Sequence, residues 1–595
     1  MSGERIQVGD KIVDLATWVP ELDTPVYEEF PVYTSANAGE VIPGVVPPLS
    51  MDVSGQVIDH GFVWMAEQLG ALRGIKLDRQ RHLRYLGFFY GRSHLNLSLI
   101  RAGADLLFGT SAEQVDEQYL GQARDPDAPR RRYSLRQRWL RLSSLPRGLR
   151  AQRAHAGRVR RNEETVREYL ARERAADLSR LSPAELLGKL RENIQLQRRA
   201  AELHLMSSAL ASTGMAQLES AVRRWLPEAD GSTVPNLCTG LAEVESAKPS
   251  FEIWRLSRMV RDSQALSAVF REQPADRIAE ALAAFQAKDV REFRRALDAF
   301  LEEYGYRGMR EVDLATPSWE ENPSFVLAMI RNYLDEDDEH DPRRVQERQA
   351  QRRQETERWA LSRLKPWQKP LFRSFLKGAR EFSAARELTK SQWVRLLNQC
   401  RKITREIGRR LAADGILAAP EDVHFLWLDE VYTLGSGRDL GYDVRERVQA
   451  RRAELEAFER IEIPEWFEGR PPARLQDAAS EAPEAAGQRV LTGIPVSPGR
   501  VTARARVITD VRRDAHIEEG EVLVAPVTDA AWTPLFLSAA AVVVDLGGPL
   551  SHGSTVAREY GLPAVVNVKV GTKVIKTGQE ITVDGTKGEV IIHGG

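Results

Sequence analysis

Apolar positions recur every three or four residues through most of the chain after residue 61. Such spacing gathers apolar side chains on one face of an α-helix. The pattern is clearest in four stretches, which are residues 183–226, 274–304, 342–364 and 380–414. These stretches are also rich in Arg, Glu and Ala, which favour helix. We therefore expect a large, mainly helical region.

Two local signals mark helix ends within this region. Pro183 follows Ser182, and proline suits the first helical turn, so a helix is expected to start there. Gly415 fits a C-terminal cap just past the helix expected over 391–414. Residues 1–60 lack this periodicity and hold Pro, Gly and β-branched residues, which predict irregular structure with short strands.

The pattern changes again towards the C-terminus. Residues 469–488, GRPPARLQDAASEAPEAAGQ, are small, polar and proline-bearing, which is typical of an interdomain linker. After them, short apolar runs alternate with Gly and Pro and predict strands, interrupted by one short helix near 551–560. We predict a mainly helical domain over 1–468, a flexible linker over 469–488 and a compact α/β domain over 489–595.

Composition narrows the class of protein. Of the 595 residues, 42% are hydrophobic and 28% are charged, the net charge is −1, and there are two cysteines. The balanced charge gives no electrostatic argument for nucleic acid or a membrane as a partner. The cysteines are far apart, which argues against a disulfide scaffold. No run of about 18 apolar residues occurs. A cytoplasmic protein is the expectation.

One stretch is strongly basic. Residues 124–161 hold thirteen Arg against only Asp125 and Asp127. A solvated helical face paired with acids elsewhere explains this, and a docking face for an acidic partner is the alternative. Nucleic-acid binding is the least favoured, because few aromatic side chains interleave with the arginines.

His552 has the setting expected of a nucleophilic histidine. An apolar strand ends in Gly547 and Gly548, and Ser551 is a plausible N-cap of the short helix that follows. His552 then lies in the first helical turn, where free N–H groups and the helix dipole favour an anion. Neutral imidazole is a competent nucleophile near pH 7. A buried structural histidine is the alternative.

The surrounding string decides between these alternatives. GG-P-L-SHGSTVAREYGLPAV resembles the swivelling phosphohistidine domain of phosphoenolpyruvate-utilising enzymes, and the resemblance covers 490–595. It implies that His552 carries a phosphoryl group, supported by Gly547, Gly548, Ser551 and Arg558. Gly553-Ser554 departs from the alanines of many relatives but stays small.

The helical region is similar to the acceptor region of rifampin phosphotransferase-type proteins. The likeness rests on residues 37–50, on Tyr304–Gly308 with the acids that follow, on Arg386-Glu387 with Lys390, and on 420–426. Many relatives carry His where Tyr306 stands and Arg where Ser318 stands. In this reading Arg307 binds phosphate oxygens and Glu311 or Asp313 takes the proton of an attacking hydroxyl. An ion-paired helical core is the alternative. The candidate substrate-binding residues are Arg92, His94 and Arg386.

The resemblance implies a multidomain phosphotransferase subunit, with a large helical acceptor domain and a small α/β swivelling phosphohistidine domain. We find no ATP-grasp-like region, a layout similar to two-subunit systems of the phenylphosphate synthase kind. We therefore expect an ATP-grasp partner that binds ATP and Mg²⁺, and a small hydroxyl-bearing acceptor, for which an aromatic compound is one candidate.

Two alternatives to this subunit stay open. In the first, the chain is a non-catalytic phosphoryl relay or regulator that binds another protein. In the second, a divergent nucleotide site lies within residues 1–480. The other nine histidines form no metal-like pair in the sequence, and we expect no metal ligands. The acceptor and the oligomeric state are not indicated.

Overall fold

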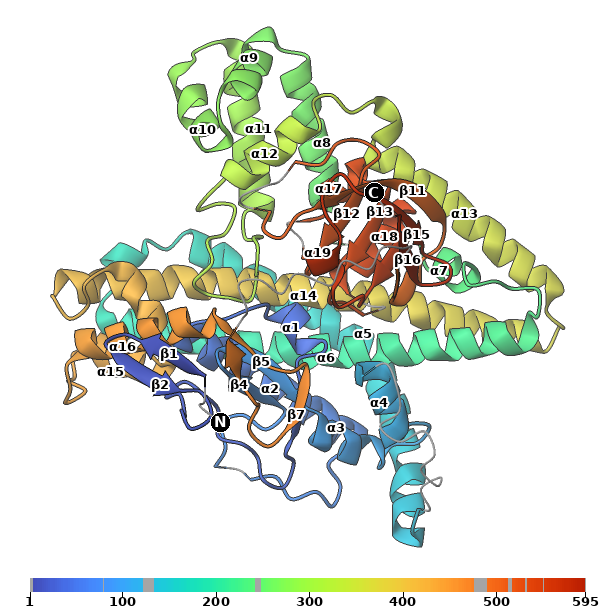
Figure 1. The fold of residues 1–595 in the computed structure, drawn as a ribbon, viewed down its shortest axis with the longest axis horizontal. Helices are drawn as coiled ribbons and strands as arrows, with labels where there is room; N and C mark the ends of the chain where they lie inside the picture. Colours follow the sequence, from blue (N-terminus) through green and yellow to red (C-terminus); the bar gives the residue numbers. More distant parts are fainter. Residues whose placement is uncertain are drawn as a thin grey trace. The chain divides into compact units, whose positions relative to one another are not determined.

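The computed structural model describes residues 4–78, 80–120, 133–240, 245, 248–475, 489–511, 516–529, 532–548 and 551–593. It is mainly helical, with a separate α/β sheet near the C-terminus (Figure 1). The predicted fold class, a large helical part and a small α/β domain, is confirmed. The chain forms two compact units: residues 1–207, 312–315 and 392–480 make unit 1, and residues 208–311, 316–391 and 481–595 make unit 2.

Unit 1 is built on long helices that bury a large apolar core, which includes Leu190, Leu396 and Ile403. Polar contacts fix the register of two of these helices, since Asn193 Nδ2 donates to the carbonyl of Leu396 at 3.0 Å. The helices of this unit are α1 (Ala38–Val41), α2 (Pro48–Leu69), α3 (Leu97–Ala104), α4 (Ala112–Leu120), α5 (Leu135–Arg174), the first part of α6 (Pro183–Trp225), the second part of α14 (Gln368–Ala413), α15 (Leu428–Gly435) and α16 (Val444–Phe458).

The strands of unit 1 are short. An antiparallel sheet has the order β4-β5-β3-β7, and two further pairs join β1 to β2 and β6 to β8. Their bounds are β1 (Arg5–Val8), β2 (Lys11–Asp14), β3 (Val32–Thr34), β4 (Leu86–Phe89), β5 (Arg92–Asn96), β6 (Ile461–Glu462), β7 (Trp466–Glu468) and β8 (Arg474–Leu475). Short 3₁₀ turns cover Leu178–Arg180 and Pro420–Phe425.

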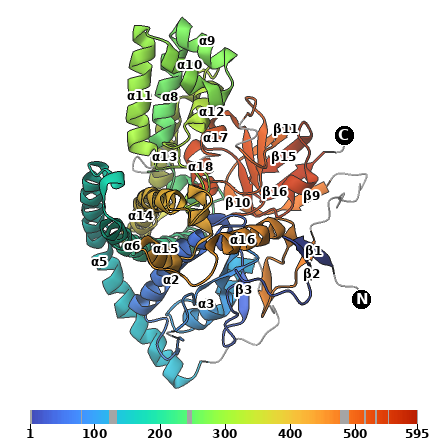
Figure 2. The ribbon, with the colours of Figure 1, turned by 90° about the vertical axis from the view of Figure 1, so that its left-hand side faces the viewer.

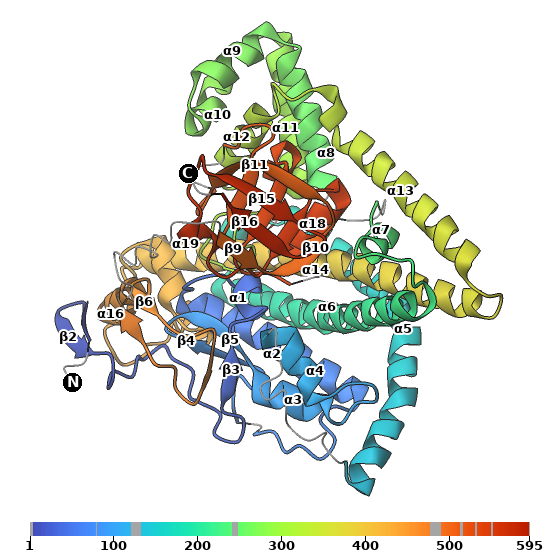
Figure 3. The same cartoon turned by 45° about the vertical axis from the view of Figure 1, so that its right-hand side comes forward.

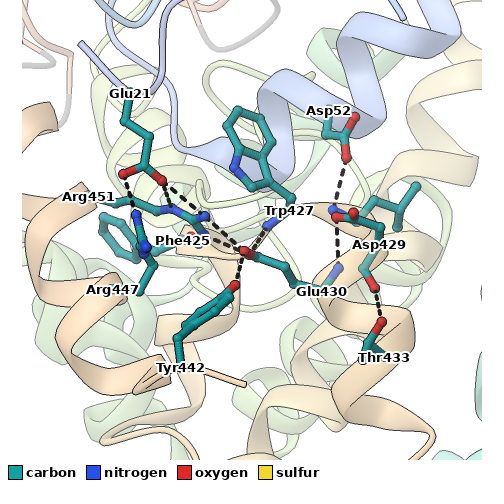
Figure 4. A network of polar contacts seen from close by, with 11 residues as sticks. Glu21, Asp52, Phe425, Trp427, Asp429, Glu430, Thr433, Tyr442, Arg447 and Arg451 are labelled. Carbon is teal, nitrogen blue, oxygen red and sulfur yellow. Dashed lines mark hydrogen bonds and ion pairs between the residues drawn. The ribbon is translucent and has the colours of Figure 1, made fainter. Parts of the chain in front are cut away.

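A buried ion pair ties three separate segments of unit 1 together (Figure 4). Both terminal nitrogens of Arg451 donate to Glu430, at 2.6 and 2.8 Å, and Arg451 also contacts Glu21. Burial alone would raise the pKa of Glu430, but hydrogen bonds from Arg451 and Tyr442 lower it on balance. Removing one partner would leave a buried charge without compensation, which is strongly destabilising. This cluster therefore holds α16 against α15 and the N-terminal segment.

Unit 2 combines helices with the C-terminal sheet. Figure 2 shows α8 to α12 gathered in a small bundle, with a core that includes Ile253, Phe270 and Phe293. The helices are the second part of α6, α7 (Thr233–Leu237), α8 (Lys248–Arg261), α9 (Gln264–Glu272), α10 (Ala275–Ala284), α11 (Lys288–Tyr304), α12 (Ser324–Asn332), a 3₁₀ turn at Asp338–His340, α13 (Pro342–Arg363), the first part of α14, α17 (Leu535–Ser538), α18 (His552–Tyr560) and α19 (Gly571–Val574).

The sheet of unit 2 has the order β10-β14-β13-β12-β11-β15-β16-β9. Strands β11, β12, β13 and β14 run parallel to one another. All the other pairs of the sheet, including β11 with β15 and β14 with β10, are antiparallel. Alternate residues of the central strands enter two different cores, as expected when both faces are covered. The bounds are β9 (Arg489–Thr492), β10 (Ile494–Ser497), β11 (Arg500–Val507), β12 (Val522–Ala525), β13 (Ala541–Val544), β14 (Ala564–Val566), β15 (Glu580–Asp584) and β16 (Glu589–Ile592).

The structure corrects the expectation for residues 48–60, and it leaves the predicted linker and the predicted domain boundaries open. Residues 48–60, predicted irregular, belong to helix α2, which starts on Pro48. Most of the predicted linker, 476–488, lies outside the described residues, and Arg474–Leu475 pair with β6. The predicted domain boundaries therefore stay a prediction.

The basic stretch is also only partly described. Residues 124–132 lie outside the described part of the chain, and the rest of 133–161 lies mostly in α5. Arg141 donates to the carbonyls of Asp105 and Thr110. The choice between a solvated face and a docking face stays open. Within the described residues, no helix combines the length and the apolar content needed to cross a bilayer.

Candidate functional site

Helix α18 has the start and the stop that its sequence predicts. Ser551 caps the N-terminus and its hydroxyl accepts from Ser554 N at 3.1 Å. Gly561, with φ of 69°, ends the helix in a left-handed conformation that favours glycine. His552 is therefore the first residue of α18, where unpaired backbone N–H groups favour a negative ligand.

The site lies beyond the carboxyl ends of two parallel strands, β12 and β13. The segment after β12 supplies Thr533, whose Oγ1 lies 2.7 Å from His552 Nε2. The chain after β13 supplies α18 and His552 itself. Crevices at the carboxyl ends of parallel strands are a frequent location for ligands in α/β sheets.

His552 is buried, with 5% of its surface exposed, although it stands at the start of a helix. Thr528 and Phe536 lie against the first turn of α18. A Cβ on Gly553 would lie 2.1 Å from Thr528 Oγ1, and Phe536 is the next neighbour. The absence of a side chain at 553 thus permits the close approach that encloses His552.

Burial and nearby cations keep the imidazole neutral. Desolvation, followed by the charge of Lys390, lowers the pKa of His552 to about 3, while Glu387 opposes this effect. Arg307 and Arg386 add smaller contributions in the same direction as Lys390. A neutral imidazole surrounded by positive charge is suited to attack a phosphoryl group and to retain it afterwards.

Arg307 and Glu311 form a buried ion pair within unit 2. Arg307 Nη1 lies 3.1 Å from Glu311 Oε1, and both side chains are 3% exposed. Lys390 Nζ lies 3.8 Å from the other oxygen, Oε2. Burial acts to lower the pKa of Arg307, but Tyr306 and Glu311 raise it on balance. Arg307 is thus always positive, and Glu311 links it to Lys390.

Helix α14 presents Arg386, Glu387 and Lys390 on neighbouring turns. Arg386 Nη1 contacts Glu387 Oε1 at 2.6 Å. All three charges act on the pKa of His552. The charges of Arg307 and Arg386 therefore act on His552, and Glu311 joins this group through Arg307 and Lys390. Their catalytic or binding roles stay predictions.

The residues predicted to support a phosphate occupy different positions. Gly548 accepts at its carbonyl from Ser551 N and Ser554 Oγ, and Gly547 packs near Ser551. These contacts shape the turn that leads into α18. Arg558 is on the last turn of the nine-residue helix and its guanidinium is 3.4 Å from the Val496 carbonyl. Its support role stays a prediction.

Three predicted site residues belong to unit 1. Asp313 Oδ1 accepts from Ser50 Oγ at 2.7 Å. His94 is 1% exposed beside the rings of Phe89 and Phe467, and its Nδ1 lies 2.9 Å from the carbonyl of Arg92. Burial lowers the pKa of His94 to about 4. The predicted roles of Asp313, Arg92 and His94 remain untested.

Thr533, Glu387 and Lys390 complete the site but were not among the predicted site residues. Lys390 stands three residues after Glu387 in the sequence, at helical spacing, so one helix face carries both. Thr533 lies nineteen residues before His552 and meets it only through the sheet. Helical spacing is a signal for Lys390, whereas the contact of Thr533 with His552 depends on the fold of the sheet.

Comparisons with known proteins match two parts of the chain. Residues 517–588 match the mobile domain of PEP-utilising enzymes, and residues 204–387 match the fourth domain of rifampicin phosphotransferase. The first match contains His552 and the second contains Arg307, Glu311 and Arg386. The expected resemblance to phosphoenolpyruvate-utilising enzymes is confirmed.

Individual relatives agree with these two matches. The chain is 33% identical to rifampicin phosphotransferase of Streptomyces sviceus over 313 residues, 51% of this chain and 34% of the relative. It is 34% identical to the prodigiosin synthesizing transferase PigC of Serratia marcescens over 354 residues, 58% and 38% of the two chains. It is 29% identical to an uncharacterised protein of Mycobacterium tuberculosis over 587 residues, 96% and 62%. The chain thus spans about a third of the first two relatives and under two thirds of the third.

Proposed function

We propose that this protein is a phosphotransferase subunit that carries a phosphoryl group on His552 Nε2 and passes it to a hydroxyl group. The observation that carries the proposal is the position of His552, neutral and buried at the start of α18, among Lys390, Arg307 and Arg386. The matches to the mobile domain and to a phosphotransferase domain support it.

In the first step, the Nε2 lone pair of His552 attacks the β-phosphorus of ATP. The N–P bond forms and the bond from this phosphorus to the AMP oxygen breaks, while the γ-phosphate leaves as inorganic phosphate with a water oxygen. We propose that a separate ATP-grasp subunit binds ATP and Mg²⁺ for this step. Thr533 then turns its hydroxyl away from Nε2, since that atom now bears phosphorus.

In the second step, an acceptor hydroxyl attacks the phosphorus and the N–P bond returns its electrons to the imidazole. Lys390, Arg307 and Arg386 offset the negative charge of the transferred group, and such preorganised cations are strong contributors to phosphoryl transfer. Glu311 accepts the hydroxyl proton in this scheme. The acceptor is a small hydroxyl compound, and rifampicin is one candidate, after the relatives' name.

ATP labelled at one chosen phosphorus atom tests the first step. The full chain, an ATP-grasp subunit and ATP labelled at the β-phosphorus should give acid-labile, base-stable label on the protein. His552→Gln should lose all label, whereas His516→Gln, an exposed histidine of the same sheet domain, should retain it. Label derived from the γ-phosphorus, or label kept by His552→Gln, would contradict the scheme.

The same reaction separates a transferase from a relay. Hydroxyl compounds added to the labelled protein should discharge it to a phosphate ester seen by phosphorus NMR. Discharge only to another protein would favour the regulatory relay instead. Labelling of the chain by ATP without any partner would place a nucleotide site on the chain itself and remove the need for the subunit.

A further inference from the structure

A second group of ionisable side chains lies in unit 2 outside the His552 site. Glu336 and His340 stand four residues apart, between α12 and α13, and Glu519 lies in the turn before β12. His340 Nδ1 is 3.4 Å from Glu336 Oε2, and His340 Nε2 is 3.7 Å from Glu519 Oε1. The exposed carboxylate of Asp337 is 3.2 Å from the same Nδ1. One ligand atom from each of Glu336, His340 and Glu519 falls within 4.8 Å of the others.

Two atoms in this group are buried without a hydrogen-bond partner among the described residues. These atoms are Glu336 Oε2 and His340 Nδ1, and they face each other. The side chain of Glu336 is only 6% exposed, so its free oxygen is withdrawn from water. An orphaned buried carboxylate oxygen is costly unless a cation or a donor satisfies it.

The geometry fits a metal better than a direct hydrogen bond. At 3.4 Å, Oε2 and Nδ1 are too far apart for a short charge-assisted bond. Zinc bonds of about 2.0–2.2 Å in a tetrahedron hold two ligands about 3.3–3.6 Å apart. Ser538 Oγ donates to Glu336 Oε1 and leaves Oε2 to point at the imidazole. Such an outer hydrogen bond orients a metal-binding carboxylate.

We propose that Glu336, His340 and Glu519 bind a divalent transition-metal ion of the zinc class. One imidazole nitrogen and two carboxylates suit zinc more than magnesium, which prefers oxygen ligands and water. The side chain of Glu519 is 62% exposed and is free to rotate towards the ion, and Asp337 or water supplies the fourth ligand.

The ion would join two parts of unit 2. Glu336 and His340 follow α12, whereas Glu519 belongs to the sheet domain. The hydroxyl of Tyr333 also donates to the carbonyl of Pro534 at 2.8 Å across the same junction. Provided that the sheet domain moves as the proposed function requires, the bound ion would hold His552 beside Lys390 and slow its exchange with the ATP-binding partner.

Zinc binding to the full chain tests the site. After treatment with a chelator, the protein should bind one Zn²⁺ in competition with a chromophoric chelator. His340→Ala should weaken this binding on the order of 100-fold and Glu519→Gln about 10-fold, because ligands are lost. His60→Ala is the matched control, since His60 contacts a single carboxylate, Glu202, at 2.8 Å.

Two results would overturn the metal site. One is binding by His340→Ala that equals the wild type, which would mean adventitious zinc elsewhere. The other is no measurable zinc binding by the wild type. Phosphorylation of His552 is measured in the same samples. If the wild type binds zinc but His552 is not phosphorylated, the proposed function is contradicted and the metal site is not.

Discussion

Burial of His552 has a consequence for stability. Because burial and Lys390 lower the pKa of His552 to about 3, the folded chain leaves this imidazole neutral where an unfolded chain, with a pKa near 6.5, protonates it. Between pH 6.5 and 3 the unfolded state therefore binds more protons. The free energy of unfolding falls on acidification through this window, by about 1.4 kcal/mol per pH unit for this group.

His552→Gln removes this proton-linked contribution. We expect the thermal midpoint of His552→Gln to fall less than that of the wild type between pH 7 and pH 5, as followed by circular dichroism. The His516→Gln chain should behave as the wild type does. An equal fall in His552→Gln would mean that His552 is protonated in the folded protein.

Lys390 offers a test of the positive charge at the site. Lys390→Met should slow phosphoryl transfer by about 100-fold, since it removes a preorganised cation next to His552. Lys377→Met is the control, because Lys377 lies on the same helix with its side chain 71% exposed. Single-turnover transfer from labelled protein measures both. A Lys390→Met chain that transfers at the wild-type rate would remove Lys390 from the site.

At the scale of the elements, periodicity predicted the long helices because each buries one regular apolar face. It failed at 48–60, where Pro48 starts α2 and twelve residues of this helix are buried around much of its circumference. A helix buried on several faces shows little amphipathic contrast in its sequence. Strand β4, beyond the region where short strands were predicted, was missed for another reason, since it is buried at every position and does not alternate.

The contact between α18 and the 528 segment predicts coupled substitutions. Gly553→Ala places a methyl group against Thr528 Oγ1 and should destabilise the protein by about 1–2 kcal/mol, as an overpacked core does. Adding Thr528→Ala should recover most of that loss. Thermal midpoints of the two single variants and the double variant complete the cycle. Strict additivity would show that the contact is absent in solution.

For the whole molecule, the sequence located the candidate site at His552 but not its full set of residues. His552, Ser551 and the two glycines stand in one contiguous string, so their relation needs no tertiary information. Arg307, Glu311 and Arg386 were found through family resemblance, and the fold of unit 2 brings them to His552. Thr533 and the Glu336–His340–Glu519 group depend on contacts between distant segments. No spacing in a single sequence predicts such contacts.

The structure places three of the predicted site residues in unit 1, and their predicted roles stay untested. Asp313 stands only two residues after Glu311, yet it belongs to unit 1 and bonds to Ser50. Proximity in sequence therefore did not establish that both acids serve one site. His94 likewise belongs to unit 1, where it packs beside the rings of Phe89 and Phe467.

The edge of the C-terminal sheet decides how the domain responds to force. Strand β9 leads into the sheet and pairs with β16, the last strand, so that Arg489 lies opposite Ile592 (Figure 3). A pull that separates these two residues opens the antiparallel pair one hydrogen bond at a time, as a zipper opens. The sheet therefore yields at its edge first. An unfolding machine that grips the final strand would meet little mechanical resistance before it reaches the parallel strands that hold His552.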